Sequence, residues 1–369
     1  MAQPSPSYTV ALHLEVPASQ KAVTTLVDTA SATGAIVNGV DVADTEGDTL
    51  IVDLTADTRD SKHRAELVKA LGAIDGVVVR NVGDSTFLAH VGGKIATASK
   101  YPIHNRRDLA RVYTPGVARV CKAIYDHPER ARQLTIKKNT VAVVTDGTAI
   151  VTLAALINAL KLVGKRIEDV RIVLSGVGAA GSAIAKLLMA HGATDIVGYG
   201  RSGALDGANT EGMNEHRKWL AENTNPRHVT GSLKEGLVGA DVLIGVSSGN
   251  LLEPADLEVM NEGAIVFAMA NPTPEVDPIG AAGYAAVVAT GRSDFPNQIN
   301  NVLAFPGLFR GLLDTGITNI SVELLRAAAT GIAGVIDDDE IRPVYIIPGA
   351  FDTRVASAVA KAVRKFAGQ

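Results

Sequence analysis

The chain has few of the features that mark secreted, membrane or nucleic-acid-binding proteins. Its 369 residues include one cysteine, Cys121, so no disulfide can form within the chain. We expect Cys121 to pack as a small apolar residue on a helix. The formal net charge is −4, which favours neither a nucleic acid nor an anionic membrane as a partner.

Long hydrophobic runs are also missing. The longest, residues 149–160, is interrupted by Thr152 and Asn158 and is too short to span a bilayer. The N-terminus, MAQPSPSYTV, has neither the basic start nor the apolar run of a signal peptide. These absences predict a cytoplasmic protein.

Aromatic residues make up only 4% of the chain, whereas glycine occurs 36 times. This balance predicts tight turns and packing between small residues. The hydrophobic content of 47% and charged content of 20% are ordinary for a soluble α/β protein. The length is enough for two or three domains.

Residues 8–82 predict a small α/β unit. The first strand is YTVALHLEV, and a helix follows that ends at Gly34. Strands are next expected in AIVNGVDVAD and DTLIVDLTAD, then a helix in SKHRAELVKALGAI and a strand in GVVVRNV. The order βαββαβ is that of the ferredoxin-like unit. It resembles the ACT domain, which implies either a small-molecule effector site or a dimerisation module at residues 1–85.

A connecting stretch at residues 83–99 leads into a mostly helical segment, KYPIHNRRDLARVYTPGVARVCKAI. The Thr-Pro-Gly run after Tyr113 predicts a break in that helix.

From residue 141 onward, buried strands alternate with helices, which is typical of a doubly wound parallel sheet. We predict strands at 141–144, 170–175, 195–199, 241–246, 264–268 and 285–289. We predict helices at 149–163, 179–190, 214–224, 232–238, 306–314, 321–335 and 353–367. Ser232 and Glu235 have the spacing of a capping box, which supports a helix start there.

A nucleotide site is indicated directly after the strand at 170–175. Gly176, Gly178 and Gly181 have G-x-G-x-x-G spacing, and Ala179 and Ala180 open the next helix. These glycines allow a tight turn, a close approach of backbone to pyrophosphate, and close helix–strand packing. Strand, motif, helix and second strand occur in the order that a Rossmann dinucleotide site requires.

The end of the second strand bears on the choice of cofactor. An NAD site usually places an acid there to bind the ribose 2′-hydroxyl. Here Gly200 occupies that place and Arg201 follows, which favours NADP over NAD, although Arg201 could also be a solvated loop residue.

Polar residues follow later strands, where loops line a cofactor crevice. Ser247 directly follows the strand at 241–246, and Asn271 lies in the loop after the strand at 264–268. A loop after the next strand carries four amides, which can hold a carboxylate and a carboxamide together, although some could serve only as caps and turns. They are Asn297, Gln298, Asn300 and Asn301.

Several stretches together resemble the malic enzyme family, in its smaller bacterial form with an N-terminal ACT-like domain. They are NRRDLARVYTPGVARVCKAI, GTAIVTLAALINALKLVGK, SGVGAAGSAIAKLL, VFAMANPTPE, ATGRSDFPNQINNVLAFPGLFRG and YIIPGAFDTRVA. The resemblance implies oxidative decarboxylation of L-malate to pyruvate and CO2 with NAD(P)+, aided by Mg2+ or Mn2+. It further implies that Tyr113 protonates the enolate, that Asn271, Asn300 and Asn301 contact substrate or nicotinamide, and that the protein is a homodimer or larger homo-oligomer.

One part of the family pattern is missing. Gly147, Thr148 and Ala149 serve both as the exit of one lobe and as the start of the next, and the segment that the family carries between them is absent. No general-base lysine or metal-binding carboxylates are found; Asp146 is a weak candidate, and Lys122, Lys137 and Lys138 are better explained as solvated. We therefore predict a truncated substrate lobe at 86–147, a Rossmann domain at 148–369, and impaired activity.

Two alternatives stay open at this point. One is a non-catalytic module that binds NAD(P) and an effector. The other is a different NAD(P)-linked dehydrogenase, for example one acting on amino acids. The amide-rich loop and the Tyr-Thr-Pro-Gly run favour the malic enzyme family over the second alternative.

Overall fold

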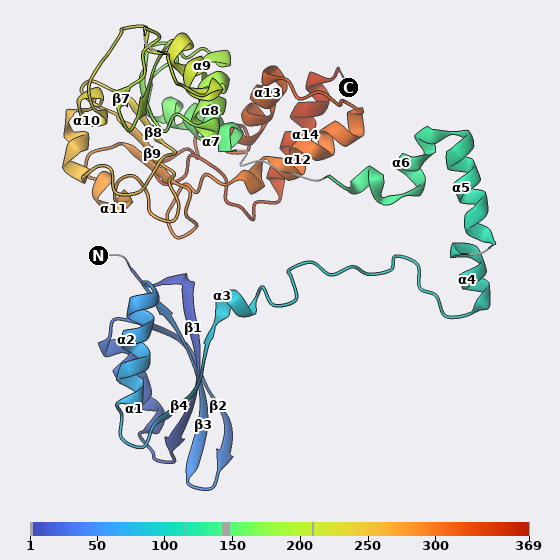
Figure 1. Cartoon of the computed structure of the whole chain (residues 1–369), viewed down its shortest axis with the longest axis vertical. Coiled ribbons are helices and arrows are strands. Elements are labelled where there is room, and N and C mark those ends of the chain that lie inside the picture. Colours follow the sequence, from blue (N-terminus) through green and yellow to red (C-terminus); the bar gives the residue numbers. More distant parts are fainter. Residues whose placement is uncertain (1–2, 114, 142–147, 209, 369) are drawn as a thin grey trace. The chain divides into compact units, whose positions relative to one another are not determined.

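The computed structural model describes residues 3–113, 115–141, 148–208 and 210–368 (Figure 1). The chain divides into two compact units, Met1–Val117 and Ala118–Gln369. The predicted strand at 141–144 and the join at Gly147 fall largely outside the described residues. No described helix is long and apolar enough to cross a membrane.

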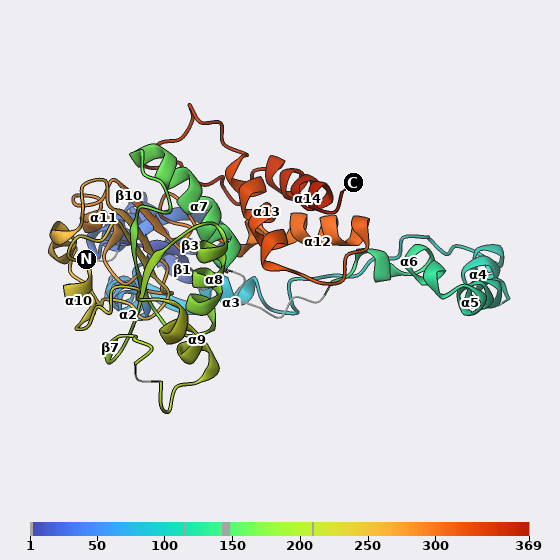
Figure 2. The same cartoon turned by 90° about the horizontal axis from the view of Figure 1, so that it is seen from above.

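The C-terminal unit is built on a six-stranded sheet of order β10-β9-β8-β5-β6-β7. Figure 2 labels β7 and β10, the two edge strands of this sheet. All neighbouring strands are parallel except the short β7, which pairs antiparallel with β6. The strands are β5 (Arg171–Ser175), β6 (Asp195–Gly200), β7 (Gly203–Ala204), β8 (Val242–Gly245), β9 (Ile265–Ala268) and β10 (Val287–Thr290). Five of them match predicted strands, and β7 was missed because two residues carry no periodic pattern.

Helices connect these strands and cover both faces of the sheet. The longer ones are α7 (Thr148–Val163), α8 (Ala179–Ala190), α9 (Glu215–Asn223), α12 (Phe305–Thr315), α13 (Val322–Ala333) and α14 (Arg354–Phe366). The shorter ones are α10 (Leu233–Gly236), η3 (Pro254–Val259), α11 (Pro278–Ala281) and η4 (Asn301–Leu303). Three short helices without buried residues precede α7: η1 (Pro128–Arg130), α6 (Ala131–Leu134) and η2 (Ile136–Asn139). The seven predicted helices are all present, and Ser232 and Glu235 form the predicted capping box at α10.

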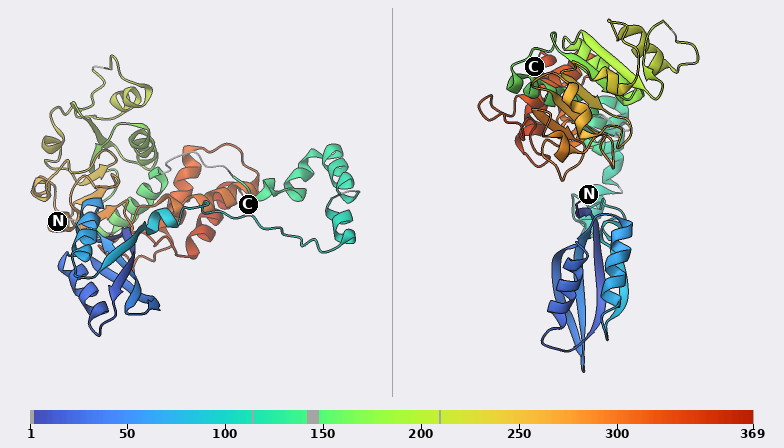
Figure 3. Two further views of the ribbon diagram at one scale, coloured as in Figure 1. Left: turned by 60° about the horizontal axis from the view of Figure 1, so that its bottom comes forward. Right: turned by 90° about the vertical axis from the view of Figure 1, so that its left-hand side faces the viewer.

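The N-terminal unit has the predicted βαββαβ order, and its sheet has the order β2-β3-β1-β4. Both helices lie on one face of that sheet (Figure 3). The elements are β1 (Ser5–Pro17), α1 (Ala22–Ala32), β2 (Ile36–Glu46), β3 (Thr49–Thr58), α2 (Ser61–Gly72) and β4 (Val78–Asp84). Every second residue of β1 from Val10 to Val16 is buried, because alternate side chains face the helices.

Three further helices follow β4: α3 (Ser85–Leu88), α4 (Arg106–Val112) and α5 (Gly116–Asp126). Helix α4 ends at Val112, with Tyr113 as its C-cap, and α5 begins at Gly116, so the predicted break between two helices is present. Cys121 lies on α5 as expected but is exposed, which corrects the prediction that it packs in a core. None of the α5 residues is buried, so this helix offers no apolar contact to enclose the thiol.

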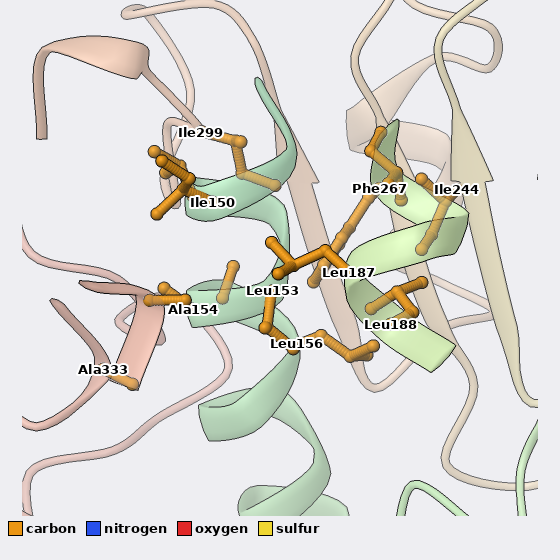
Figure 4. Packing of buried hydrophobic residues seen from close by; sticks show 14 of the residues in the cluster. Ile150, Leu153, Ala154, Leu156, Leu187, Leu188, Ile244, Phe267, Ile299 and Ala333 are labelled. Atoms are coloured by element: carbon orange, nitrogen blue, oxygen red, sulfur yellow. The ribbon is translucent and has the colours of Figure 1, made fainter. Parts of the chain in front are cut away.

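The core of the C-terminal unit has two layers, one on each face of the sheet. Ile172 and Leu174 of β5 face a layer built by α7, α8 and α13, whereas Val173 between them faces the opposite layer. This alternation follows from the two-residue period of a strand. Figure 4 shows Leu153 and Leu156 of α7 packed near Leu187 and Leu188 of α8. Helix α7 is therefore a core element of this unit.

Candidate functional site

A crevice opens at the carboxyl ends of β5 and β8. These strands are neighbours in the sheet, yet β6 follows β5 in the chain and lies on its other side. The chain direction across the sheet thus reverses between β5 and β8, and in open parallel sheets ligands bind at such a point. A cavity of about 940 Å³ lies here, large enough for most of a dinucleotide.

The glycine-rich turn between β5 and α8 forms one wall of the cavity. Gly176 has φ of +118°, and a Cβ there would come within 2.7 Å of the Val246 carbonyl oxygen. A Cβ on Gly181 would lie 1.9 Å from the Gly176 carbonyl oxygen. Gly178 is the N-cap of α8, and a Cβ on it would meet nothing within 4 Å. Two glycines are thus required by packing, and the third leaves open space where a phosphate can approach the backbone.

The opposite wall is the loop after β8, and it is tied to two other elements. The Ser247 hydroxyl lies 2.9 Å from that of Ser175, at the end of β5. Its backbone N–H donates to the carboxylate of Glu275 over 2.8 Å, and the Ala270 N–H donates to the same carboxylate over 3.0 Å. Glu275 is fully buried, and this burial raises the pKa of its carboxyl group.

The far end of the cavity lies beside β6. Gly200, Arg201, Ser202 and Arg217 line it, and Arg217 comes from helix α9. No Asp or Glu is present among the described residues that line the cavity. The residues present therefore fit the phosphate groups of a dinucleotide, because hydrogen-bond donors lie both at the glycine-rich turn and at this end.

The loops after β9 and β10 are linked to each other. Asn271 is exposed and directly follows Ala270, and Arg292 donates to the Pro272 carbonyl oxygen over 3.0 Å. The loop that carries the four amides is thereby joined to the loop that carries Asn271. Both loops follow neighbouring parallel strands, so they share one edge of the sheet.

Two of the four amides have structural roles. Asn297 is buried with φ of 56°, and its side chain bonds to the Val288 and Pro343 carbonyls and the Ile346 N–H. Asn300 accepts from the Val302 N–H as the N-cap of η4. Asn300 and Asn301 are both half-buried.

The residue that the sequence proposes for catalysis, Tyr113, is not among those that line the cavity. Tyr113 is 65% exposed and belongs to the N-terminal unit. Lys122 pairs with Asp126 on the exposed helix α5, as a solvated lysine would. Among the described residues, no group of three or more His, Cys, Asp and Glu side chains could hold a metal ion. The donor set that is present therefore does not fit a divalent cation, and Asp146 lies outside the described residues.

The structure brings four predicted cofactor residues to one cavity: Gly176, Gly178, Arg201 and Ser247. Ala179, Ala180 and Gly181 form the first turn of α8 beside it, and Asn271, Asn300 and Asn301 lie on the neighbouring loops. Sequence reasoning missed Arg217 and Glu275. Arg217 sits in a polar helix with no motif, and Glu275 is recognisable only as an acid among residues that become buried.

This fold and crevice define a Rossmann-type dinucleotide-binding protein. Two family models match the chain: the malic enzyme NAD-binding domain over residues 145–368, and the malic enzyme N-terminal domain over residues 92–159. The first spans more than half of the chain, and the chain belongs to the malic enzyme family.

This chain is similar to several malic enzymes over nearly their whole length. An NAD-dependent malic enzyme of Geobacillus stearothermophilus is 38% identical, with 93% of this chain and 92% of that protein covered. A bifunctional malic/malolactic enzyme of Bacillus subtilis is also 38% identical, with coverages of 74% and 90%. The solved structure of an NAD-dependent malic enzyme from Thermotoga maritima matches with a TM-score of 0.71 at 33% identity, covering 76% of this chain and 99% of that one.

The alignments to longer relatives also contain positions that have no counterpart in this chain. The Geobacillus alignment has 439 positions but covers 93% of 369 residues, about 343, so about 96 positions have no counterpart here. The Bacillus subtilis alignment has 369 positions over 74% of the chain, about 273 residues, and leaves the same difference of about 96. An alignment to a Rhizobium meliloti NADP-dependent malic enzyme has 239 positions over 60%, about 221 residues, and leaves only about 18.

The excess therefore belongs to the part of the family that only the longer alignments include. The two family models overlap at residues 145–159, which contain the predicted join at Gly147, Thr148 and Ala149. The place of the unmatched positions, at this join, stays a prediction from the sequence.

Proposed function

We propose that this protein is a malic enzyme by descent that binds NAD(P) and L-malate in the C-terminal unit and oxidatively decarboxylates malate at an impaired rate. The observation that carries the proposal is the contrast between a cavity lined by the glycine-rich turn and an alignment to a relative in which about 96 positions have no counterpart in this chain. When bound, NAD(P)+ accepts a hydride from the carbon that bears the hydroxyl group of malate.

The residues of this chain would bind and orient the reactants. The backbone N–H groups at the start of α8 would hold the pyrophosphate, and Ser247 would face the cofactor from the opposite wall. Asn271 and Asn301 are suited to malate and the nicotinamide carboxamide, because amides both donate and accept hydrogen bonds. Tyr113 would supply the proton to the enolate carbon.

The impairment follows from groups that the described residues lack. Hydride transfer from an alcohol requires a base for the hydroxyl proton, and no lysine is placed as that base. A metal ion would stabilise the enolate left by CO2, but the donors present do not fit one. Loss of groups that act together in one reaction lowers turnover by orders of magnitude.

The test measures binding and turnover on the same preparation of the intact protein. Fluorescence titration gives the Kd for NADH and NADPH, and a coupled assay with L-malate, Mn2+ and each oxidised cofactor follows pyruvate. We expect cofactor binding with pyruvate formation far below that of the Geobacillus enzyme assayed in parallel. Turnover equal to that enzyme would contradict the impairment, and absence of binding to either cofactor would contradict the site.

For the N-terminal unit we propose an ACT-like module that joins two chains or binds a small effector. Its core, built around Leu12, Leu54 and Leu67, is separate from the cores of the C-terminal unit. Its edge strands expose apolar residues, Ile36 and Val42 on β2 and Val78 and Val82 on β4. Such edges favour pairing with another strand. Light scattering of the intact protein would test association, and a monomer at all concentrations would leave only the effector role.

A further inference from the structure

The second strand of the nucleotide fold ends beside two guanidinium groups. Arg201 directly follows β6, and Arg217 reaches the same end of the cavity from the first turn of α9. They are the charged residues among the described lining of the cavity, which at this end also includes the polar side chains of Tyr199, Ser202 and Ser232. The lining therefore carries positive charge that no lining carboxylate offsets.

Arg217 is held at this place by its surroundings. Its backbone N–H donates to the Asn214 side chain over 3.0 Å, which fixes the start of α9. The Ser182 hydroxyl donates to the His216 carbonyl oxygen over 3.1 Å and so attaches α9 to α8. The terminal Nη2 of Arg217 lies 3.5 Å from where a Cβ on Gly200 would be. The guanidinium of Arg217 therefore lies directly beside position 200, at the end of β6.

The guanidinium of Arg217 is incompletely satisfied within the protein. Its Nε is buried and makes no hydrogen bond to any described residue. A buried donor without a partner costs free energy, and charge-assisted bonds from arginine to phosphate are among the strongest hydrogen bonds in proteins. An anion bound at this end of the cavity would therefore give a partner to a buried guanidinium N–H that has none among the described residues.

We propose that Arg217, together with Arg201, binds the 2′-phosphate of the cofactor and makes this protein selective for NADP(H) over NAD(H). The inference rests on the proposed function, because it requires that the crevice bind the dinucleotide through the turn at Gly176. In that orientation the adenosine ribose lies at the end of the second strand, where Gly200 replaces the acid that binds a free 2′-hydroxyl. Arg217 thus acts as a specificity-determining residue that no sequence motif marks.

The test compares NADPH and NADH binding to the intact protein and to Arg217→Met, which keeps much of the apolar stem. Wild type is expected to bind NADPH at least about tenfold more tightly than NADH. In the variant the Kd for NADPH should rise about 10- to 100-fold, the loss typical of a charge-assisted bond, while that for NADH changes less than threefold. The control is Lys218→Met, since Lys218 is the next residue, pairs with Glu222, and does not line the cavity.

A second measurement needs only the wild type and covers the case in which Arg217→Met fails to fold. Adenosine 2′,5′-bisphosphate should displace bound NADPH at least about tenfold more effectively than adenosine 5′-monophosphate. Equal displacement, tighter binding of NADH than of NADPH, or equal losses for both cofactors in Arg217→Met would each overturn the inference while leaving the crevice as a dinucleotide site. No binding of either cofactor would instead refute the proposed function on which the inference rests.

Discussion

The buried carboxylate of Glu275 accepts the backbone N–H of Ser247 over 2.8 Å, across 28 residues of sequence. The same carboxylate accepts the Ala270 N–H from the neighbouring strand end. One side chain therefore holds together the loops that follow β8 and β9, which carry Ser247 and Asn271. Its position fixes the cofactor wall from behind without facing the cavity.

Changing Glu275→Gln should alter how stability depends on pH. Burial raises the pKa of Glu275 above its usual value of 4.5. Its protonated form is therefore favoured by folding, so its contribution to stability is full below pH 4.5 and declines as pH rises through the raised pKa. The Tm of wild type minus that of the variant should fall between pH 4 and the raised pKa, because glutamine cannot ionise. Thermal melts across this range measure the difference.

The control for that experiment is Glu258→Gln, which makes the same chemical change at an exposed glutamate. A flat difference for Glu275→Gln would contradict the raised pKa.

Changing Gly178→Ala should weaken cofactor binding without weakening the fold. A Cβ here meets nothing within 4 Å and the backbone φ is −93°, so we expect the free energy of unfolding to change by less than about 0.5 kcal/mol. The added methyl occupies the approach of the pyrophosphate, so the Kd for NADPH should rise at least about tenfold. Fluorescence titration and urea melts on one sample check both statements. An unchanged Kd would show that phosphate does not approach this glycine.

Changing Gly181→Ala should do the opposite and act on the fold. Its Cβ would lie 1.9 Å from the Gly176 carbonyl oxygen, so the turn and α8 must move apart. We expect a loss of about 1–3 kcal/mol in the free energy of unfolding, as in other overpacked sites. Urea denaturation measures it, with Gly178→Ala, three residues earlier at the N-cap of α8, as a matched control. Equal stability of the two variants would contradict the packing described for the turn.

Substitution of Asn297 is expected to lower the stability of the fold more than it weakens the binding of malate. Its side chain makes three hydrogen bonds, and its φ of 56° lies in the left-handed region. Asn297→Gly removes the bonds but tolerates this backbone, whereas Asn297→Ala also adds strain of about 1–2 kcal/mol. Both variants should unfold at lower urea concentration, with Asn297→Ala the less stable. A full-stability Asn297→Ala would mean that these bonds contribute nothing.

Much of the C-terminal unit could be predicted because its signals are local. The strand from Arg171 to Ser175 contains the apolar run Ile172 to Leu174. The spacing of Gly176, Gly178 and Gly181 then indicates the turn and the helix start directly. The capping box at Ser232 is equally local. Roles that depend on distant partners could not be read in this way. Asn297 and Asn300 belong to the same amide-rich loop of the sequence. In the fold, Asn297 is buried and hydrogen-bonded to three distant residues, whereas Asn300 caps a helix.

The sequence by itself determined the alternation of strands and helices and the glycine-rich turn, because each is a pattern among neighbouring residues. Only the tertiary structure decided that Glu275 clasps two loops and that Arg217 reaches the end of β6. Both depend on the order of strands in the sheet, which brings chain segments together regardless of their separation in sequence. Burial and unpaired charge, which give these two residues their properties, exist only after that packing has formed.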